Sequence, residues 1–158
     1  MKILIIKRAI LTILCVAVML IINFFSSQSA NDSKELSRSV TRKIVSVMPN
    51  NDSENSQAAE DAKVLEKDEE VRSAAHVGLF LVLGIVLSMT LYEYNVPKAF
   101  LFAFLFCVLY AVFDEKYQEL LEKGRAFEWV DLLKDWSGSF IGITFVAIAH
   151  RIRKKRKE

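Results

Sequence analysis

The hydrophobic residues of this 158-residue chain are concentrated in four blocks, and the charged residues lie between them. The blocks cover residues 9–25, 74–92, 99–113 and 136–149, and none of them contains Asp, Glu, Lys or Arg. A soluble domain of this size mixes charged residues into its helices, whereas long uncharged blocks are typical of membrane spans. The pattern therefore predicts an all-α integral membrane bundle of four transmembrane helices.

The limits of the spans follow from the charged or polar residues that flank the blocks. A helix needs about 20 residues to cross the hydrocarbon, so 20 residues are counted from the flanking residues expected on the inner side. The predicted spans are about 8–27, 73–92, 98–117 and 131–150. The blocks are shorter than these spans because the outer turn of each span is polar.

The first outer connection, residues 28–72, is much longer than the other connections. Its first part repeats apolar residues every three or four positions up to Pro49, which predicts an extra amphipathic helix at about 33–48. Residues 50–62 are rich in Asn, Ser, Asp and Glu, which indicates a polar linker. Helix is expected again from about Lys63 into the second span.

Lys and Arg are distributed unevenly between the two sides of such a bundle. The segments on the side of the two termini hold ten Lys and Arg and two Asp and Glu. The opposite side holds eleven Lys and Arg and seventeen Asp and Glu. The positive-inside rule then places both termini in the cytoplasm. The basic residues 151–157 are expected to contact anionic membrane lipid, and no nucleic-acid partner is predicted. A cleavable signal ending at Ala30 is disfavoured by Gln28 at its −3 position.

Polar side chains occur just inside the outer boundary of all four predicted spans. At that depth they are costly unless they face one another or water. We therefore predict a shared polar site at the outer mouth of the bundle, with Arg72 and Arg125 as counter-ions. The alternative is that these groups only hold the helix ends together. The candidate residues are Ser26, Ser27, Gln28, Arg72, His76, Asp114, Glu115, Gln118, Arg125, Asp131 and Asp135.

The helical period supports an inward orientation for the acids of the last span. At about 100° per residue, Asp131, Asp135, Gly138 and Gly142 fall on one narrow stripe. The two glycines allow another helix to approach closely. The carboxyl groups on the same stripe are therefore expected to point into the bundle. Cys15 and Cys107 both lie in apolar blocks and are expected to be packing residues.

Several of these residues form motifs that occur in the same order in a known family. They are FFSSQ at 24–28, RSAAH at 72–76, the D-E-x-x-Q pattern of Asp114, Glu115 and Gln118, Gly124-Arg125, and the D-x-x-x-D-x-x-G-x-x-x-G stripe of the last span. Together they resemble the VanZ-like family of bacterial membrane proteins over nearly the whole chain. Ser73 and Tyr117 depart from the family pattern, which often has Lys and His there.

The resemblance implies a plasma-membrane protein of the bacterial cell envelope, chiefly of Gram-positive bacteria. The namesake of the family lowers susceptibility to teicoplanin, a lipoglycopeptide antibiotic. The resemblance implies no particular biochemical mechanism.

Three functions remain open from the sequence. The first is a non-enzymatic envelope protein whose outer polar site binds a lipid-linked wall precursor or a lipoglycopeptide. The second is a membrane enzyme acting on a lipid-phosphate or wall-precursor substrate, with His76 as base or metal ligand. A divalent cation such as Mg²⁺ or Mn²⁺ would suit its carboxylates, although the sequence requires no cofactor. The third is a small transporter or an assembly subunit. The sequence leaves the ligand and the oligomeric state open.

Overall fold

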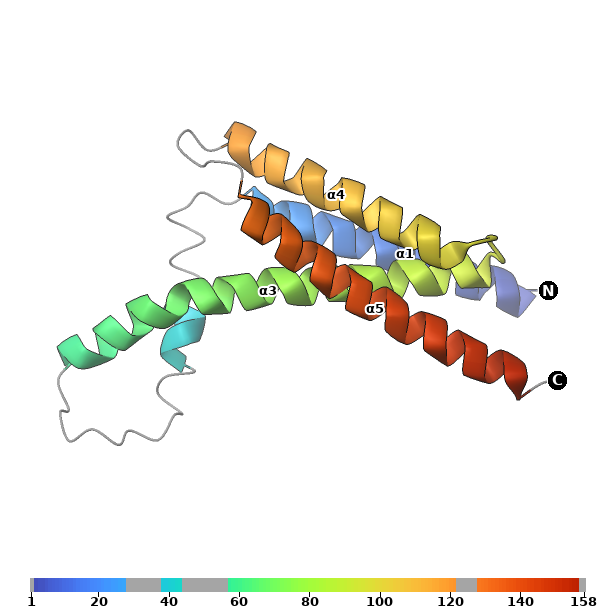
Figure 1. Cartoon of the computed structure of the whole chain (residues 1–158), viewed down its shortest axis with the longest axis horizontal. Coiled ribbons are helices and arrows are strands. Elements are labelled where there is room, and N and C mark those ends of the chain that lie inside the picture. The colour runs from blue at the N-terminus through green and yellow to red at the C-terminus, as the bar shows by residue number, and fades with distance from the viewer. Residues whose placement is uncertain (1, 28–37, 44–56, 122–127, 157–158) are drawn as a thin grey trace. The chain divides into compact units, whose positions relative to one another are not determined.

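The computed structural model describes residues 2–27, 38–43, 57–121 and 128–156. In the range 57–121, the description covers only the backbone of residues 57–63, 65, 66, 68, 69 and 72. The secondary structure of the described residues is helical, without strands, as the sequence predicts. The long helices are α1 (Lys2–Ser26), α3 (Gln57–Glu93), α4 (Ala99–Leu121) and α5 (Trp129–Lys155), and residues 38–43 form a short helix (Figure 1).

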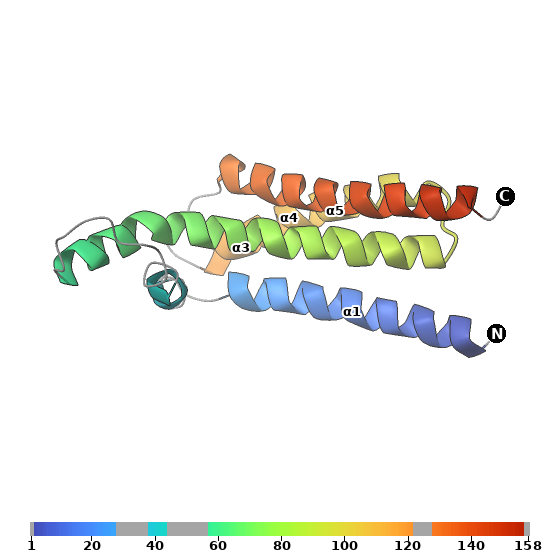
Figure 2. The same cartoon turned by 90° about the horizontal axis from the view of Figure 1, so that it is seen from below.

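The chain divides into two compact units, Met1–Ser27 with His76–Glu158, and Gln28–Ala75. In the first unit α1, the part of α3 from His76 onward, α4 and α5 lie side by side (Figures 1 and 2). We call these four helical segments the bundle. The first residues of α1 and the last residues of α5 lie at the same end of it, which we call the terminal end.

The bundle is held together by apolar side chains that each helix contributes from one face. Phe80, Leu83, Ala103, Cys107 and Ile143 are almost or completely inaccessible to solvent. Both cysteines are free thiols buried in this core, in agreement with the packing role expected for them. Between apolar helices of this length, such side chains hold the bundle together through close van der Waals packing.

Glycines bring α3 and α5 unusually close together. A Cβ atom on Gly138 would collide with the backbone carbonyl oxygen of Val77, and one on Gly142 with that of Leu81. A Cβ on Gly84 of α3 would likewise collide with the backbone of α5. The predicted role of Gly138 and Gly142 in helix packing is thus visible in the structure, and α3 is the helix that they contact.

Within the described part of the chain, three helical segments are long and apolar enough to cross a membrane, namely Lys2–Ser26, Ser73–Glu93 and Trp129–Lys155. The exterior of the bundle is correspondingly apolar, since Ile13 is 68% and Phe145 67% exposed. Helix α4 is not among the three. Its uncharged stretch, 99–113, is about 22 Å long at 1.5 Å per residue, which is shorter than the roughly 30 Å hydrocarbon core.

The helices extend beyond the predicted spans. Residues 57–62, predicted as part of the polar linker, belong to α3, because the Gln, Ala and Glu among them are good helix formers. Of the predicted amphipathic helix at 33–48, residues 38–43 are helical and the remainder lies outside the described residues. Val40, one of the regularly spaced apolar residues of this segment, is exposed. The remaining linker residues, 50–56, also lie outside the described range.

Candidate functional site

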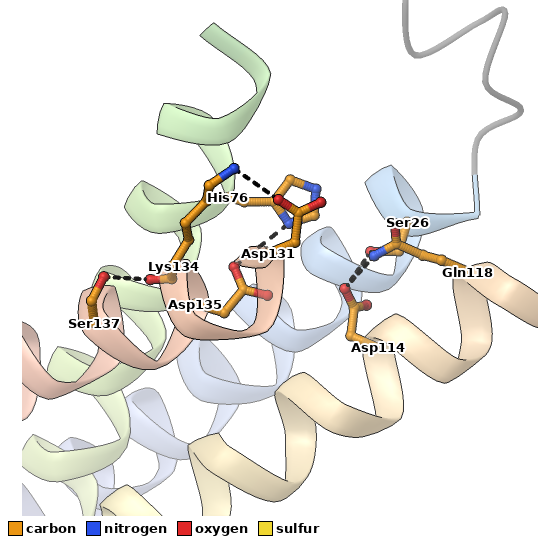
Figure 3. Close-up of polar contacts among 8 residues, drawn as sticks. All are labelled: Ser26, His76, Asp114, Gln118, Asp131, Lys134, Asp135 and Ser137. Atoms are coloured by element: carbon orange, nitrogen blue, oxygen red, sulfur yellow. Dashed lines mark hydrogen bonds and ion pairs between the residues drawn. The ribbon is translucent and has the colours of Figure 1, made fainter. Parts of the chain in front are cut away.

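Asp114 is the most deeply buried acid of the described chain, and its carboxylate is oriented by two hydrogen bonds. Ser26 donates from Oγ to Oδ2 at 2.8 Å, and Gln118 donates from Nε2 to the same oxygen at 2.8 Å. The Gln118 amide also lies 3.4 Å from the Ser26 hydroxyl. The three side chains join the last turn of α1 to α4, four residues separating Asp114 and Gln118 on one face of the helix (Figure 3).

Asp135 of α5 is buried almost as completely, with 2% of its surface exposed. Its Oδ1 lies 3.8 Å from Nδ1 of His76 on α3, which points toward it (Figure 3). That distance is too long for a hydrogen bond. Among the residues that the structure describes, nothing donates a hydrogen bond to Oδ1 of Asp135.

His76, Asp114 and Asp135 come together although they lie on three different helices. One potential ligand atom from each lies within 4.8 Å of the others. With the two residues that orient Asp114, they form what we call the polar cluster: Ser26, His76, Asp114, Gln118 and Asp135. It lies at the end of the bundle opposite the terminal end, because α1 finishes there and α5 begins there.

Two further acids lie beside the polar cluster and have partners of a different kind. Oε1 of the buried Glu115 accepts a hydrogen bond from the backbone N–H of Glu128, the residue that precedes α5, at 2.9 Å. Asp131 accepts a hydrogen bond from Nζ of Lys134 at 2.8 Å, one turn along the same helix. Asp131 is partly exposed, and its ion pair is of the ordinary i,i+3 type.

Comparison with family models decides where the protein belongs. A model described as VanZ/LLP1 matches residues 11–150, a range that includes the whole polar cluster. The chain belongs to the VanZ/LLP1 family. No curated protein and no solved structure matches the chain. The match confirms the resemblance of its motifs, and the three span-length helices agree with a VanZ-family membrane protein.

The remaining predicted site residues of this VanZ-family protein are placed differently. Ser27 is exposed, and its hydroxyl donates to the backbone carbonyl of Phe24 at 2.9 Å rather than to the polar cluster. Gln28, Arg125 and the side chain of Arg72 lie outside the described residues.

Two partners of the acids were absent from the sequence prediction, Lys134 and the backbone of Glu128. The i,i+3 spacing of Asp131 and Lys134 is a signal that could have indicated their ion pair. No pattern in the sequence indicates the bond between Glu115 and Glu128, because helical periodicity relates residues of one helix, whereas Glu115 belongs to α4 and Glu128 precedes α5.

The electrostatic character of the polar cluster follows from its burial. Two carboxylates in a low-dielectric interior repel each other unless a positive charge balances them. Surrounding hydrogen bonds lower the cost of burying Asp114, and the imidazole of His76 is close enough to Asp135 to share charge with it. Such an arrangement is suited to binding a cation or a hydrogen-bond-donating headgroup, and to transferring a proton.

Proposed function

We propose that this protein is a four-span VanZ-family membrane protein of the bacterial cell envelope that binds the polar part of a lipid-linked ligand at the polar cluster. The observation that carries the proposal is the convergence of buried Asp114 and Asp135 with His76 at one end of a bundle with an apolar exterior. Buried ionisable groups in membrane helices are expensive and usually functional.

The exterior of α4 supports its assignment as a fourth span. Leu109 is 69% exposed and Phe113 56%, and both lie in the uncharged stretch that precedes Asp114. Large apolar side chains at this exposure fit contact with lipid better than contact with water. The acyl or polyprenyl chain of such a ligand would lie in the lipid beside α4, and its polar part would contact the carboxylates at the end of α4.

The proposed ligand class is a lipid-linked wall precursor or a lipoglycopeptide. Family membership favours teicoplanin, since the namesake of the family lowers susceptibility to it. The proposal places the polar cluster on the outer side of the plasma membrane and both termini in the cytoplasm. The supporting observation is the distribution of Lys and Arg, ten against two acids on the side of the termini.

Binding can be tested with full-length protein in lipid nanodiscs and teicoplanin as the probe. We expect the acylated antibiotic to bind and the same molecule without its acyl chain to bind at least about tenfold more weakly, equivalent to about 1.4 kcal/mol. Asp114→Asn should abolish binding, and Glu119→Gln should not, because Glu119 pairs with Lys116 on the exposed side of α4. Equal binding to all three proteins would exclude the polar cluster as the binding site.

Orientation is tested separately by single cysteines at Ser53, Asn95 and Lys157 in intact cells. A membrane-impermeant thiol reagent should label only the first. The native Cys15 and Cys107 are buried and give little background. Labelling of position 157 without permeabilisation would show that the C-terminus is outside.

A membrane enzyme is the second candidate, and the pairing of His76 with Asp135 favours it. The Nδ1 atom of His76 lies 3.8 Å from a buried carboxylate oxygen, and a carboxylate beside an imidazole supports its action as a general base. The corresponding test is to incubate the purified protein with a polyprenyl pyrophosphate and to measure release of inorganic phosphate. Release that His76→Ala abolishes would establish the enzyme, and a rate equal to the buffer blank would exclude this reaction.

A further inference from the structure

We infer that the polar cluster binds one divalent transition-metal ion, with His76, Asp114 and Asp135 as its protein ligands. The inference rests on the proposed function in using the same cluster, and it deepens that function by naming an inorganic cofactor for it. Three observations carry it: the spacing of the donor atoms, the buried Asp135 oxygen that receives no hydrogen bond, and the hydrogen bonds that orient Asp114.

The spacing of the donor atoms fits a shared ion better than it fits direct contact. Two ligands held about 2.1 Å from one metal ion are themselves roughly 3–4 Å apart. Nδ1 of His76 and Oδ1 of Asp135 are 3.8 Å apart, and the three residues offer atoms within 4.8 Å of one another. The separation of His76 and Asp135 is already within the range for two ligands of one ion, and the donor atom of Asp114 lies no more than 4.8 Å from each of theirs.

Asp135 supplies the second observation. Its Oδ1 is buried without a hydrogen-bond donor among the described residues, and it faces the donor atoms of His76 and Asp114. A buried carboxylate oxygen left without a partner destabilises the fold by several kcal/mol in an apolar interior. A metal ion would satisfy this oxygen directly.

The support around Asp114 resembles the outer shell of a metal site. Ligating carboxylates are held in place by further hydrogen bonds, which orient them toward the ion. Ser26 and Gln118 both donate to Oδ2 of Asp114 and thereby fix the plane of its carboxylate. Helix α1 therefore takes part in the site through an orienting residue and not through a ligand.

The donor set selects the class of metal. One imidazole nitrogen with two carboxylates suits Mn²⁺ or Zn²⁺, because imidazole favours transition metals and carboxylates favour harder cations. A closed structural zinc site has four protein ligands, mostly cysteine and histidine. Three ligands leave coordination positions open, where a water molecule or a ligand phosphate would bind.

The test uses full-length protein that has been treated with a chelator and then titrated with Mn²⁺ or Zn²⁺ alone. We expect one ion per chain by elemental analysis. Electron spin-echo spectroscopy of the Mn²⁺ form should show coupling to a histidine nitrogen. His76→Ala should remove that coupling and weaken binding about 100-fold or more, and Ser26→Ala should weaken it about tenfold.

The chain contains only two histidines, so His150→Ala is the matched control and should keep both the stoichiometry and the nitrogen coupling. Asp135→Asn and Asp131→Asn form a second pair, of which only the first should lose the ion. Absence of bound metal in the wild-type protein would overturn the inference, as would nitrogen coupling that His150→Ala removes. If the wild-type protein binds teicoplanin but takes up no metal ion, the metal site is overturned and the proposed function stands. If the protein binds the metal ion but not teicoplanin, the metal site stands and the proposed ligand is wrong.

Discussion

The two ends of the bundle each contain a histidine, but the two side chains have different surroundings. At the terminal end, His150 is exposed and stacks on Tyr92 with ring centroids 4.2 Å apart. At the opposite end, His76 is mostly covered and faces the buried acids Asp114 and Asp135. The first arrangement needs no ligand, whereas the second brings together charges that require compensation.

Lys7, Arg8 and Glu93 at the terminal end have their partners within the chain. Lys7 forms an ion pair with Glu93, and the guanidinium of Arg8 donates two hydrogen bonds to the backbone carbonyl of Glu93, at 3.1 and 3.0 Å. Arg8 also lies over the ring of Tyr94, 5.0 Å from its centroid. Opposite charges in partial contact with solvent anchor helix ends. Like charges that are buried together indicate a site, and this difference distinguishes the two ends.

Asp135→Asn should have the largest effect, and it should affect binding rather than stability. The change keeps the size of the side chain and removes one of two buried negative charges. Affinity for Mn²⁺ should fall about 100-fold, equivalent to about 2.7 kcal/mol, while the melting temperature stays the same or rises because less charge is buried. Glu93→Gln at the terminal end should leave metal affinity unchanged. A fall in melting temperature with normal metal affinity would assign Asp135 a purely structural role.

Gly138→Ala should have the next largest effect, because the added Cβ meets the backbone of Val77. Overpacking of this kind costs about 1–3 kcal/mol. The separation of α5 from α3 would also move Asp135, three residues away, relative to His76. Gly78→Ala is the matched control, since a Cβ there meets no atom within 4 Å. Unfolding in detergent, followed by fluorescence of the two tryptophans of α5, compares the variants. Equal stability of the two would show that α3 and α5 separate without cost.

The sequence predicted the polar cluster to the extent that helical period and membrane depth define it. Asp114 and Asp135 each lie a fixed number of residues from the charged residue that marks the terminal end of their helix, and each shares a face with packing residues. The depth and the direction of both side chains could therefore be predicted. Contact between His76 and these acids followed from the same two quantities.

The partners of Glu115 could not be predicted in this way. Asp114 and Glu115 are adjacent, so their side chains diverge by about 100° around α4 and reach different partners. The sequence assigned both to one site, whereas the structure bonds Glu115 to the start of α5. Helix ends are not set by the spans, because the length of a span measures the hydrocarbon and polar residues continue the helix beyond it, as at Gln57 and Lys155.

Adjacent serines at the end of α1 give a finer test of where the polar cluster stops. Ser26→Ala removes the hydrogen bond to the carboxylate of Asp114 and should destabilise the protein by about 1.5–3 kcal/mol, the range for bonds to charged groups. The lower part of this range is expected because Gln118 still donates to the same oxygen. Ser27→Ala should change stability by less than about 0.5 kcal/mol, since Ser27 is exposed. Thermal unfolding of both variants in one detergent makes the comparison, and similar losses would extend the cluster to Ser27.

The smallest effect is expected at the terminal end, from Lys7→Ala. The Lys7 side chain is 55% exposed, so its ion pair with Glu93 is largely screened by water and salt. Its removal should cost between about 0 and 1 kcal/mol, and raising the salt concentration should abolish the difference from wild type. Because Arg8 still holds the backbone of Glu93, α1 should remain attached to α3 and metal affinity at the distant polar cluster should be unchanged. A loss of metal affinity in Lys7→Ala would show that the two ends are coupled through α1, and the distinction between an anchoring end and a binding end would then fail.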